Sequence, residues 1–327
     1  MSAHVPNLIV AALILPAVLG SLTLLLLRHR LDASRLVSLG SCLALVGIAA
    51  SLTMHASSGA VESYALGNWR APFGIVLVLD RLSAMMLLLT SVLALAVMSY
   101  AVVTGADRKG WHFHPLFQFQ LLGLNGAFLT GDLFNLFVFF EVLLIASYGL
   151  LLHGQGAARL KAGVQYVVIN LVGSTLFLVG VGLLYGVTGT LNMADMAVRV
   201  SEASPGDQGL IAAAALVLTV VFALKAALVP LHFWLPGAYA ATTATVAALF
   251  AIMTKVGAYA LIRTGTLIFG EDAGTLAWLT GDWMLPAAII TTVIGFVGLF
   301  AARTLREMAA WSVVGSMGVL LSAVSVF

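Results

Sequence analysis

The sequence predicts an all-α, polytopic membrane protein with about ten transmembrane helices. Of its 327 residues, 61% are apolar and only 9% are charged, whereas soluble domains carry about 25% charged residues. Apolar runs of about 20 residues, the length that crosses a bilayer, recur along the whole chain. The longest polar gaps, near 54–74 and 188–209, are too short to contain the core of a soluble domain.

The apolar runs define the first five spans. The first is not a signal peptide, because the segment from Met1 to Asn7 has no Lys or Arg and no small-residue cleavage site follows a short apolar core. Asp80 opens the long third span and Asp132 separates the fourth from the fifth; we favour helix caps or interfacial anchors over transport roles for both. These spans cover about 7–27, 35–54, 75–103, 115–130 and 133–153.

The remaining five spans include one that is interrupted. The seventh is followed by the apolar segment PLHFWLPGAYAA at 230–241, which contains Pro230 and Pro236. Proline removes a backbone donor and clashes with the preceding turn, so we expect a broken helix. In the sixth span, the spacing of Gly182 and Gly186 predicts close packing against another helix. The last five spans cover about 162–187, 209–229, 243–263, 284–301 and 308–327.

The basic residues predict the orientation of these spans. Loops after the first, third, fifth and ninth spans hold nine Lys and Arg residues, the opposite loops hold four, and two more lie inside spans. The odd-numbered loops are therefore expected in the cytoplasm, with the N-terminus outside. The nine are Arg28, Arg30, Arg35, Arg108, Lys109, Arg159, Lys161, Arg303 and Arg306, and the four are Arg70, Arg81, Arg199 and Arg263.

The chain contains no residues suited to redox chemistry of its own. Cys42 is the only cysteine, and one thiol neither holds an iron–sulfur cluster nor forms an internal disulfide. No nucleotide-binding loop or haem motif is present. His112 and His114 flank Phe113, but such a pair is weak evidence for a metal, and we favour an interfacial position. We therefore expect no cofactor and no metal, and no nucleic-acid partner.

Three ionisable residues lie deep inside apolar spans: Glu141, Lys225 and Lys255. A charged group at a helix centre costs about 2.5–3.5 kcal/mol on insertion scales, so the three together cost on the order of 8–10 kcal/mol. A structural ion pair between Glu141 and Lys225 is the alternative to a functional role. Lys255 has no obvious carboxylate partner on a neighbouring span, which favours function, because a buried lysine has a lowered pKa and can release its proton.

These charges predict a proton path. A charge pair at about 4 Å is worth roughly 4 kcal/mol at an effective dielectric of 20, or about three pKa units. We therefore expect Lys225 to keep its proton when Glu141 approaches and to release it towards Lys255 when Glu141 withdraws. His232, just past the break, either passes protons between the two lysines or caps the broken helix. We expect the hydroxyls of Thr242, Thr243, Thr245 and Thr254 to satisfy their own helix rather than to hold water.

Three stretches of the chain resemble a known family. LTGDLFNLFVFFEVLLIASYGLL, ALKAALVPLHFWLPGAYAATTATVAALFAIMTKVGAYALIR and RTLREMAAWSVVGSMG are similar to the antiporter-like subunits of proton-translocating membrane arms, above all to the D-type subunits of the multisubunit Mrp/Pha-type cation/proton antiporters. The resemblance covers essentially the whole chain. Complex I and membrane-bound hydrogenases contain related subunits, which are the nearest alternative assignments.

The resemblance implies fourteen helices and two five-helix repeats of inverted topology, each with one broken helix. It implies that Glu141, Lys225, His232 and Lys255 form the proton path, the residues that the charge argument also selects. It divides the chain into an N-terminal three-helix region (1–114), a complete proton-translocating repeat (115–263) and the start of a second, incomplete repeat (264–327). Because the chain stops at Phe327, we expect a truncated product or part of a gene.

The expected function is that of a membrane subunit in a Na⁺/H⁺ or K⁺/H⁺ antiporter, located in the bacterial inner membrane with other membrane subunits as partners. The alternative is a proton-pumping membrane subunit of an NADH:quinone oxidoreductase or a membrane-bound hydrogenase, which would make the chain part of an enzyme complex. A third possibility is a non-conducting structural remnant. The sequence contains no evident Na⁺ or K⁺ cage.

Overall fold

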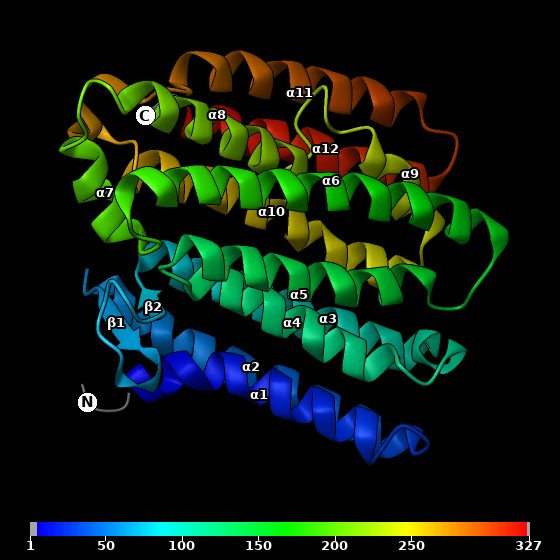
Figure 1. Ribbon diagram of the computed structural model, residues 1–327. Coiled ribbons are helices and arrows are strands. Elements are labelled where there is room, and N and C mark those ends of the chain that lie inside the picture. The colour runs from blue at the N-terminus through cyan, green and yellow to red at the C-terminus, as the bar shows by residue number, and fades with distance from the viewer. Residues whose placement is uncertain (1–4, 326–327) are drawn as a thin grey trace. The chain divides into compact units, whose positions relative to one another are not determined.

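The computed structural model describes residues 5–325 and divides the chain into two compact units between Gly156 and Ala157 (Figure 1). The predicted end of the tenth span, at residue 327, lies outside the described residues.

The first unit is a bundle of five helices with a small hairpin. In this unit α1 packs on α2 and α4, α2 packs on α3, and α4 packs on α5. Its core is formed by large apolar side chains of α1, α2, α3 and α4, among them Ile9, Leu52 and Leu87. The helices are α1 (Val5–Leu25), α2 (Leu31–Ser57), α3 (Arg81–Thr104), α4 (Phe113–Leu129) and α5 (Leu133–Leu152).

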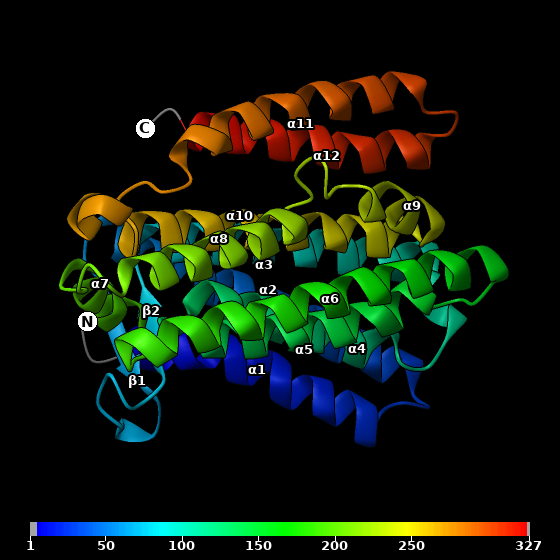
Figure 2. The ribbon, with the colours of Figure 1, turned by 45° about the horizontal axis from the view of Figure 1, so that its top comes forward.

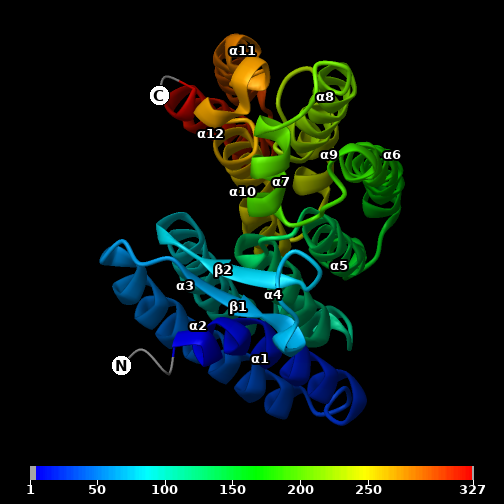
Figure 3. The ribbon, with the colours of Figure 1, turned by 60° about the vertical axis from the view of Figure 1, so that its left-hand side comes forward.

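The hairpin corrects the predicted start of the third span. Residues 76–79 form the strand β2 (Val76–Leu79), which pairs antiparallel with β1 (Glu62–Ala65), and Figure 3 shows the pair across the ends of this unit's helices. The helix begins only at Arg81, because Asp80 caps it: the Asp80 carboxylate accepts from the Ser83 N–H, and the Ser83 hydroxyl accepts from the Asp80 N–H.

Asp80 and Asp132 both act as helix caps, one of the two roles that the sequence favours. Asp132 accepts a 2.7 Å hydrogen bond from the Asn135 N–H and so starts α5, as Asp80 starts α3. A carboxylate at this position satisfies a backbone donor that the helix itself leaves unpaired and interacts favourably with the helix dipole. Both acids therefore fix where an apolar span begins.

The second unit contains the interrupted span. Figure 2 shows α11 and α12 side by side in this unit, and α12 also packs on α9. A short helix that the sequence did not predict, α7, starts where the Asn192 side chain accepts from the N–H groups of Ala194 and Asp195. The helices are α6 (Ala157–Thr188), α7 (Met193–Ser201), α8 (Gln208–Lys225), α9 (Trp234–Ala241), α10 (Ala244–Leu267), α11 (Gly281–Ala301) and α12 (Leu305–Val324).

The predicted fold class is confirmed. Within residues 5–325, nine helices are long and apolar enough to cross a membrane: α1, α2, α3, α5, α6, α8, α10, α11 and α12. The remaining predicted span, 115–130, corresponds to α4, which has 17 residues and is nearly as long. The predicted seventh span corresponds to α8 and α9 with a break between them. The chain is thus a multi-pass membrane protein.

The glycine prediction for α6 is wrong within this chain. A Cβ added at Gly182 or Gly186 would meet no other described atom within 4 Å. The close approach occurs elsewhere: a Cβ at Gly257 in α10 would lie 2.5 Å from the backbone nitrogen of Ala226, directly after α8. The absence of a side chain at Gly257 therefore lets α10 pack against the break in the seventh span.

Candidate functional site

The break in the seventh span has a defined geometry. α8 ends at Lys225, and Ala227 follows with a left-handed φ of 56°. The Ala227 N–H donates to the Leu224 carbonyl and the Leu228 N–H donates to the Ala223 carbonyl, the pattern of a Schellman motif, in which glycine usually occupies the left-handed position. The predicted interruption is therefore present, and it begins five residues before Pro230.

Two further hydrogen bonds hold the break in place. The indole N–H of Trp234, the first residue of α9, donates to the Leu224 carbonyl at 3.1 Å. The Val229 N–H donates to the Thr291 hydroxyl of α11 at 3.0 Å. The non-helical segment thus has partners for its backbone groups, as irregular backbone inside a membrane requires.

Lys225 is buried in the second unit, with only 5% of its surface exposed. Its Nζ donates to the Oδ1 of Asn170 in α6 at 3.0 Å. The Asn170 Nδ2 in turn donates to the Tyr166 carbonyl at 2.8 Å, which orients the amide oxygen towards the lysine. Gly173 of α6 packs beside the site, because a Cβ there would lie only 2.8 Å from the Leu224 side chain, whereas its distance to Nζ, 3.7 Å, is an ordinary contact.

An aromatic cluster borders this lysine site. Tyr166, Trp234, Tyr239 and Phe250 are all buried, and their neighbouring ring centroids lie 5.5 to 6.3 Å apart. The Tyr239 hydroxyl donates to the Phe250 carbonyl at 2.7 Å. Two members of the cluster are directly linked to the site, Tyr166 through Asn170 and Trp234 through the carbonyl of Leu224. The cluster therefore fixes the surroundings of Lys225.

Lys255 lies in α10, half-buried, and faces a different helix. Its Nζ donates to the Oγ of Ser316 in α12 at 3.3 Å. The backbones of the two lysine segments are close, because Gly257 packs on the chain directly after Lys225. The two ammonium groups nevertheless point to different helices, Lys225 to α6 and Lys255 to α12.

His232 lies on the same side as Lys255. Its ring is half-buried and 5.7 Å from the ring of Trp311 in α12. Trp311 and Ser316 are five residues apart, a rise of roughly 7.5 Å along that helix. Its buried Nδ1 has no hydrogen-bond partner among the described residues. His232 thus presents a ring nitrogen that can exchange a proton.

Glu141 belongs to the first unit. It lies half-buried in the middle of α5, with Tyr148 two helical turns further on the same face. The three basic residues belong to the second unit, so the pairing of Glu141 with Lys225 stays a prediction. The threonine prediction is confirmed at two positions: Thr243 caps α10 by accepting from the Val246 N–H, and Thr254 donates to the Ala251 carbonyl of its own helix.

The predicted histidine pair separates into an exposed and a buried residue. His112 is exposed, whereas His114 is 3% exposed and contacts the Oδ2 of Asp107 at 3.3 Å and the hydroxyl of Ser38 at 3.0 Å. Asp107 also accepts two hydrogen bonds from the Arg35 guanidinium, at 2.6 and 2.8 Å. Across residues 5–325 we find no group of three His, Cys, Asp or Glu side chains placed to hold a metal.

The electrostatics of Asp107 follow from these contacts. Burial disfavours the ionised carboxyl, but the hydrogen bonds and charge of Arg35 and the contact with His114 outweigh it and hold the pKa of Asp107 below its ordinary value. Asp107 therefore stays ionised at neutral pH. This cluster is a stationary ion pair at one end of the first unit.

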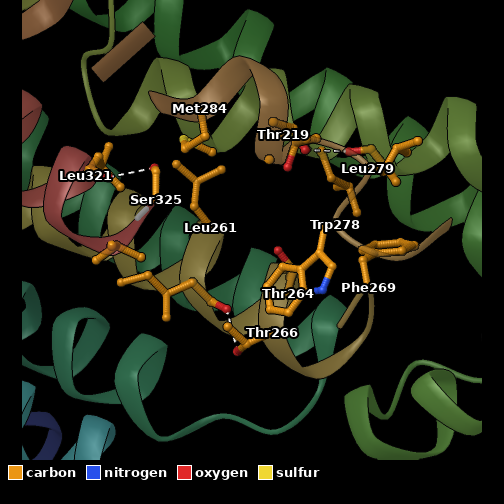
Figure 4. A pocket seen from close by; sticks show the side chains of 17 residues that line it. Thr219, Leu261, Thr264, Thr266, Phe269, Trp278, Leu279, Met284, Leu321 and Ser325 are labelled. Carbon is orange, nitrogen blue, oxygen red and sulfur yellow. Dashed lines mark hydrogen bonds between the residues drawn. The ribbon is translucent and has the colours of Figure 1, made fainter. Parts of the chain in front are cut away.

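A separate cavity of about 360 Å³ lies at the far end of α8 and α10 in the second unit (Figure 4). Its walls include Thr219, Leu261, Trp278 and Met284, and none of Lys225, His232 and Lys255 lines it. Thr219 and Leu261 are each six residues from the lysine on their helix, roughly 9 Å along the axis. The hydroxyl groups of Thr219, Thr264 and Thr266, which line this cavity, donate to carbonyls of their own helices.

Sequence reasoning missed the residues that hold the lysines. Asn170 lies in the apolar stretch VVINLVGS, and Ser316 lies in α12. A polar side chain within a transmembrane helix indicates by itself that the residue faces another helix or a polar group. The sequence does not say which lysine each one meets.

A family model for the transmembrane part of the NADH:quinone oxidoreductase/Mrp antiporter proteins matches residues 130–327. The chain belongs to this family. Other members resemble it over a longer stretch: a probable K⁺/H⁺ antiporter D-type subunit of Rhizobium meliloti is 53% identical over 80% of this chain and 48% of its own length. The Na⁺/H⁺ antiporter D-type subunit of Alkalihalophilus pseudofirmus is 39% identical over 98% of this chain and 64% of its own length.

Solved structures of family members agree with the fold. A chain of the Mrp complex from Dietzia sp. DQ12-45-1b superposes with a TM-score of 0.87 and 31% identity, covering 100% of this chain and 60% of that one. A chain of the membrane-bound sulfane sulfur reductase, an archaeal respiratory membrane complex, superposes with a TM-score of 0.89 and 27% identity, covering 97% and 64%. The chain spans about half to two thirds of the length of the curated relatives it matches.

Proposed function

We propose that this chain acts as a membrane subunit of a monovalent cation/proton antiporter and that protons move through Glu141, Lys225, His232 and Lys255. The observation that carries the proposal is Lys225: a lysine 5% exposed, at the end of an interrupted helix, hydrogen-bonded to a neutral amide. Relatives with the names of Na⁺/H⁺ and K⁺/H⁺ antiporter subunits support the cation class. Among the described residues, no side chain evidently distinguishes Na⁺ from K⁺.

The proposed mechanism moves one proton along a series of ionisable side chains. Glu141 is the switchable counter-ion, which keeps the Lys225 ammonium charged when it is near. When Glu141 withdraws, Lys225 gives its proton to His232, and His232 gives it to Lys255. The contacts of His232 and Lys255 with the same helix, α12, support this order over a direct transfer between the lysines. A lysine rather than an arginine is needed, because the guanidinium does not lose its proton in proteins.

The test is Lys225→Ala in inverted membrane vesicles that contain the chain together with its partner subunits. We expect cation-dependent proton movement to fall to the level of vesicles without the chain, while the amount of protein in the membrane stays unchanged. Lys161→Ala is the matched control, because Lys161 is exposed at the start of α6. Transport at the normal rate in the Lys225 variant would refute the proposed path.

The competing function is a proton-pumping membrane subunit of a respiratory complex. The family itself covers both NADH:quinone oxidoreductases and Mrp antiporters, and one structural relative is a respiratory membrane complex. Growth separates the two: we expect a deletion strain to grow poorly in high Na⁺ or K⁺ at alkaline pH. Normal growth there, together with neighbouring genes for cluster-binding subunits, would favour the respiratory function.

We further propose that the N-terminus faces outward, that the partners are the other membrane subunits of the complex, and that residues 115–263 form the proton-translocating repeat between the region 1–114 and the start of a second repeat at 264–327. The excess of basic residues in the loops after odd-numbered spans supports the orientation. Labelling of a single cysteine introduced at Lys109 tests it, in a Cys42→Ala background. We expect a membrane-impermeant thiol reagent to reach this cysteine in inverted vesicles but not in intact cells.

A further inference from the structure

A second cavity of about 360 Å³ lies in the first unit, where the end of α1, the start of α4 and the end of α5 meet. Its volume falls within the range of small-molecule pockets, about 300–1,000 Å³. The apolar part of its lining comes from Leu24, Leu116, Phe119 and Leu152. This cavity is not part of the proposed proton path, since Glu141 does not line it.

The outer part of the same cavity is basic and aromatic. Lys109, Trp111 and His112 line it, and all three are exposed. His29 packs edge-on against Trp111, with ring centroids 4.8 Å apart, and so places the loop that contains Arg28 and Arg30 beside the rim. The rim therefore concentrates positive charge at the end of the unit where the loop charges predict the cytoplasm.

Among the described residues, no acidic side chain lines this cavity to cancel the charge. The buried acid in the adjacent turn, Asp107, is already engaged by both arms of the Arg35 guanidinium. α4 also starts here, at Phe113, and its N-cap residue His112 makes no side-chain cap, so the first N–H groups of the helix have no capping acceptor from that residue. A helix N-terminus favours negative charge, which adds to the effect of the basic side chains.

We propose that this cavity binds an anionic glycerophospholipid. The phosphate lies at Lys109 and His112, with Trp111 at the level of the headgroups, and one acyl chain enters the apolar part beside Leu116 and Phe119. A tryptophan at the polar end of an apolar cleft is typical of the membrane interface, and basic pockets between transmembrane helices on the cytoplasmic side are suited to anionic lipid headgroups. The combination of a basic rim with an apolar interior selects a lipid over a free phosphate ion.

The experiment is native mass spectrometry of the purified full chain with phosphatidylglycerol or phosphatidylcholine at equal concentration. We expect the chain to retain phosphatidylglycerol over phosphatidylcholine by about fivefold for each basic side chain that meets the headgroup. In Lys109→Gln/His112→Gln the preference should fall to about twofold or less. Both side chains are exposed, so the fold is expected to remain intact, and Lys161→Gln, which removes an exposed lysine in the second unit, should leave the preference unchanged.

A second variant tests the apolar part. Leu116→Trp fills the interior next to Gly149 and should reduce lipid retention at least fivefold with the basic rim intact; circular dichroism and gel filtration verify its fold. Three results overturn the proposal: equal retention of the two lipids by the unmodified chain, unchanged preference in Lys109→Gln/His112→Gln, or displacement of the lipid by inorganic phosphate at the same concentration. Retained lipid in a folded Leu116→Trp variant would equally exclude the acyl-chain site.

Discussion

Two charged groups in different units of this protein have different kinds of hydrogen-bond partner, one charged and one neutral. In the first unit, Asp107 is fully buried and accepts two short hydrogen bonds from the Arg35 guanidinium. In the second, Lys255 is half-buried and donates to the neutral hydroxyl of Ser316, by a longer bond of 3.3 Å. A bidentate pair with an arginine keeps both charges fixed, since the arginine does not deprotonate. A lysine beside a neutral group retains the ability to lose its proton.

The comparison separates a charge that is fixed by an ion pair from a charge that can lose its proton. Lys225 belongs with Lys255 in one respect, because it too donates to a neutral side chain, the amide of Asn170. The difference between the two regions leads to five predictions, which concern the charged groups, their partners and the packing beside them.

The largest effect is expected when a fixed counter-charge is given to Lys225. Asn170→Asp places a carboxylate where the amide oxygen lies, 3.0 Å from Nζ. A pair at about 4 Å raises the proton affinity of the lysine by about three pKa units, so vesicle proton transport should fall by up to a thousandfold. Asn192→Asp, a change at the cap of α7 where aspartate is equally suitable, is the control and should transport normally.

The second prediction removes the fixed pair. Asp107→Asn leaves the Arg35 charge without its carboxylate, and the loss of one partner of a buried pair costs about 3 kcal/mol or more in the free energy of unfolding. Thermal unfolding of the purified chain measures it. Asp32→Asn is the control, because Asp32 is fully exposed and lies 3.6 Å from the same arginine. An equal change in both variants would show that the buried pair has no special role.

The same pair also predicts a dependence of stability on pH. The pKa of Asp107 is lower in the folded protein than in the unfolded chain, so its contribution is complete above the ordinary aspartate pKa of about 3.9 and is lost as the pH falls through the folded-state pKa. We expect Asp107→Asn to lose less stability than the unmodified chain between neutral pH and about pH 3.

The fourth prediction replaces Lys255 by a residue that is also positively charged but does not lose its proton. Lys255→Arg keeps a cation next to Ser316, but the proton affinity rises by at least two pKa units, so transport should fall by about a hundredfold while the protein still assembles. The measurement is the initial rate of proton movement in vesicles. Lys161→Arg is the control at an exposed position. A rate within about twofold of the unmodified protein would mean that Lys255 does not need to release a proton.

The smallest effect concerns packing at the break. Gly257→Ala adds a Cβ 2.5 Å from the Ala226 nitrogen, so the backbone next to Lys225 must shift, at a cost of about 1–3 kcal/mol in unfolding free energy. Gly182→Ala meets no described atom within 4 Å in this chain and replaces a glycine inside a helix, so it should be neutral or stabilising. Equal stability of the two variants would contradict the close approach of α10 to the break.

Much of the fold follows from the sequence, for identifiable reasons. Apolar runs locate the spans because backbone groups inside a membrane must be paired within the helix. Pro230 and Pro236 predict the broken helix, and Asp132 precedes the predicted fifth span, whose start is that of α5. The strand at 76–79 was missed, because a short apolar run that precedes a helix has no periodicity to distinguish strand from helix. The spacing of Asp80 and Ser83, which form the capping box of α3, was the available signal that the helix starts after residue 80.

The charged residues of the candidate site could be predicted from the sequence, but their contact partners could not. Glu141, Lys225 and Lys255 are identified by the cost of a charge inside a span, and His232 by its position after the break. Their role stays a prediction. The helices that the lysines face were not predictable, because they depend on how α6, α8, α10 and α12 pack. The sequence led us to expect a transfer from Lys225 towards Lys255. Because the two ammonium groups point to different helices, the proposed path passes through His232 instead.

The hydrogen bond from Trp234 to the carbonyl next to Lys225 has a practical consequence. Trp234 is 4% exposed, whereas Trp69, Trp111, Trp278 and Trp283 are exposed. Its indole is therefore a built-in fluorophore beside the lysine, and a shift in its emission would report when the charge state or the backbone at that position changes. With these four exposed tryptophans and the half-buried Trp311 replaced by phenylalanine, the protein could be followed during turnover without any attached dye.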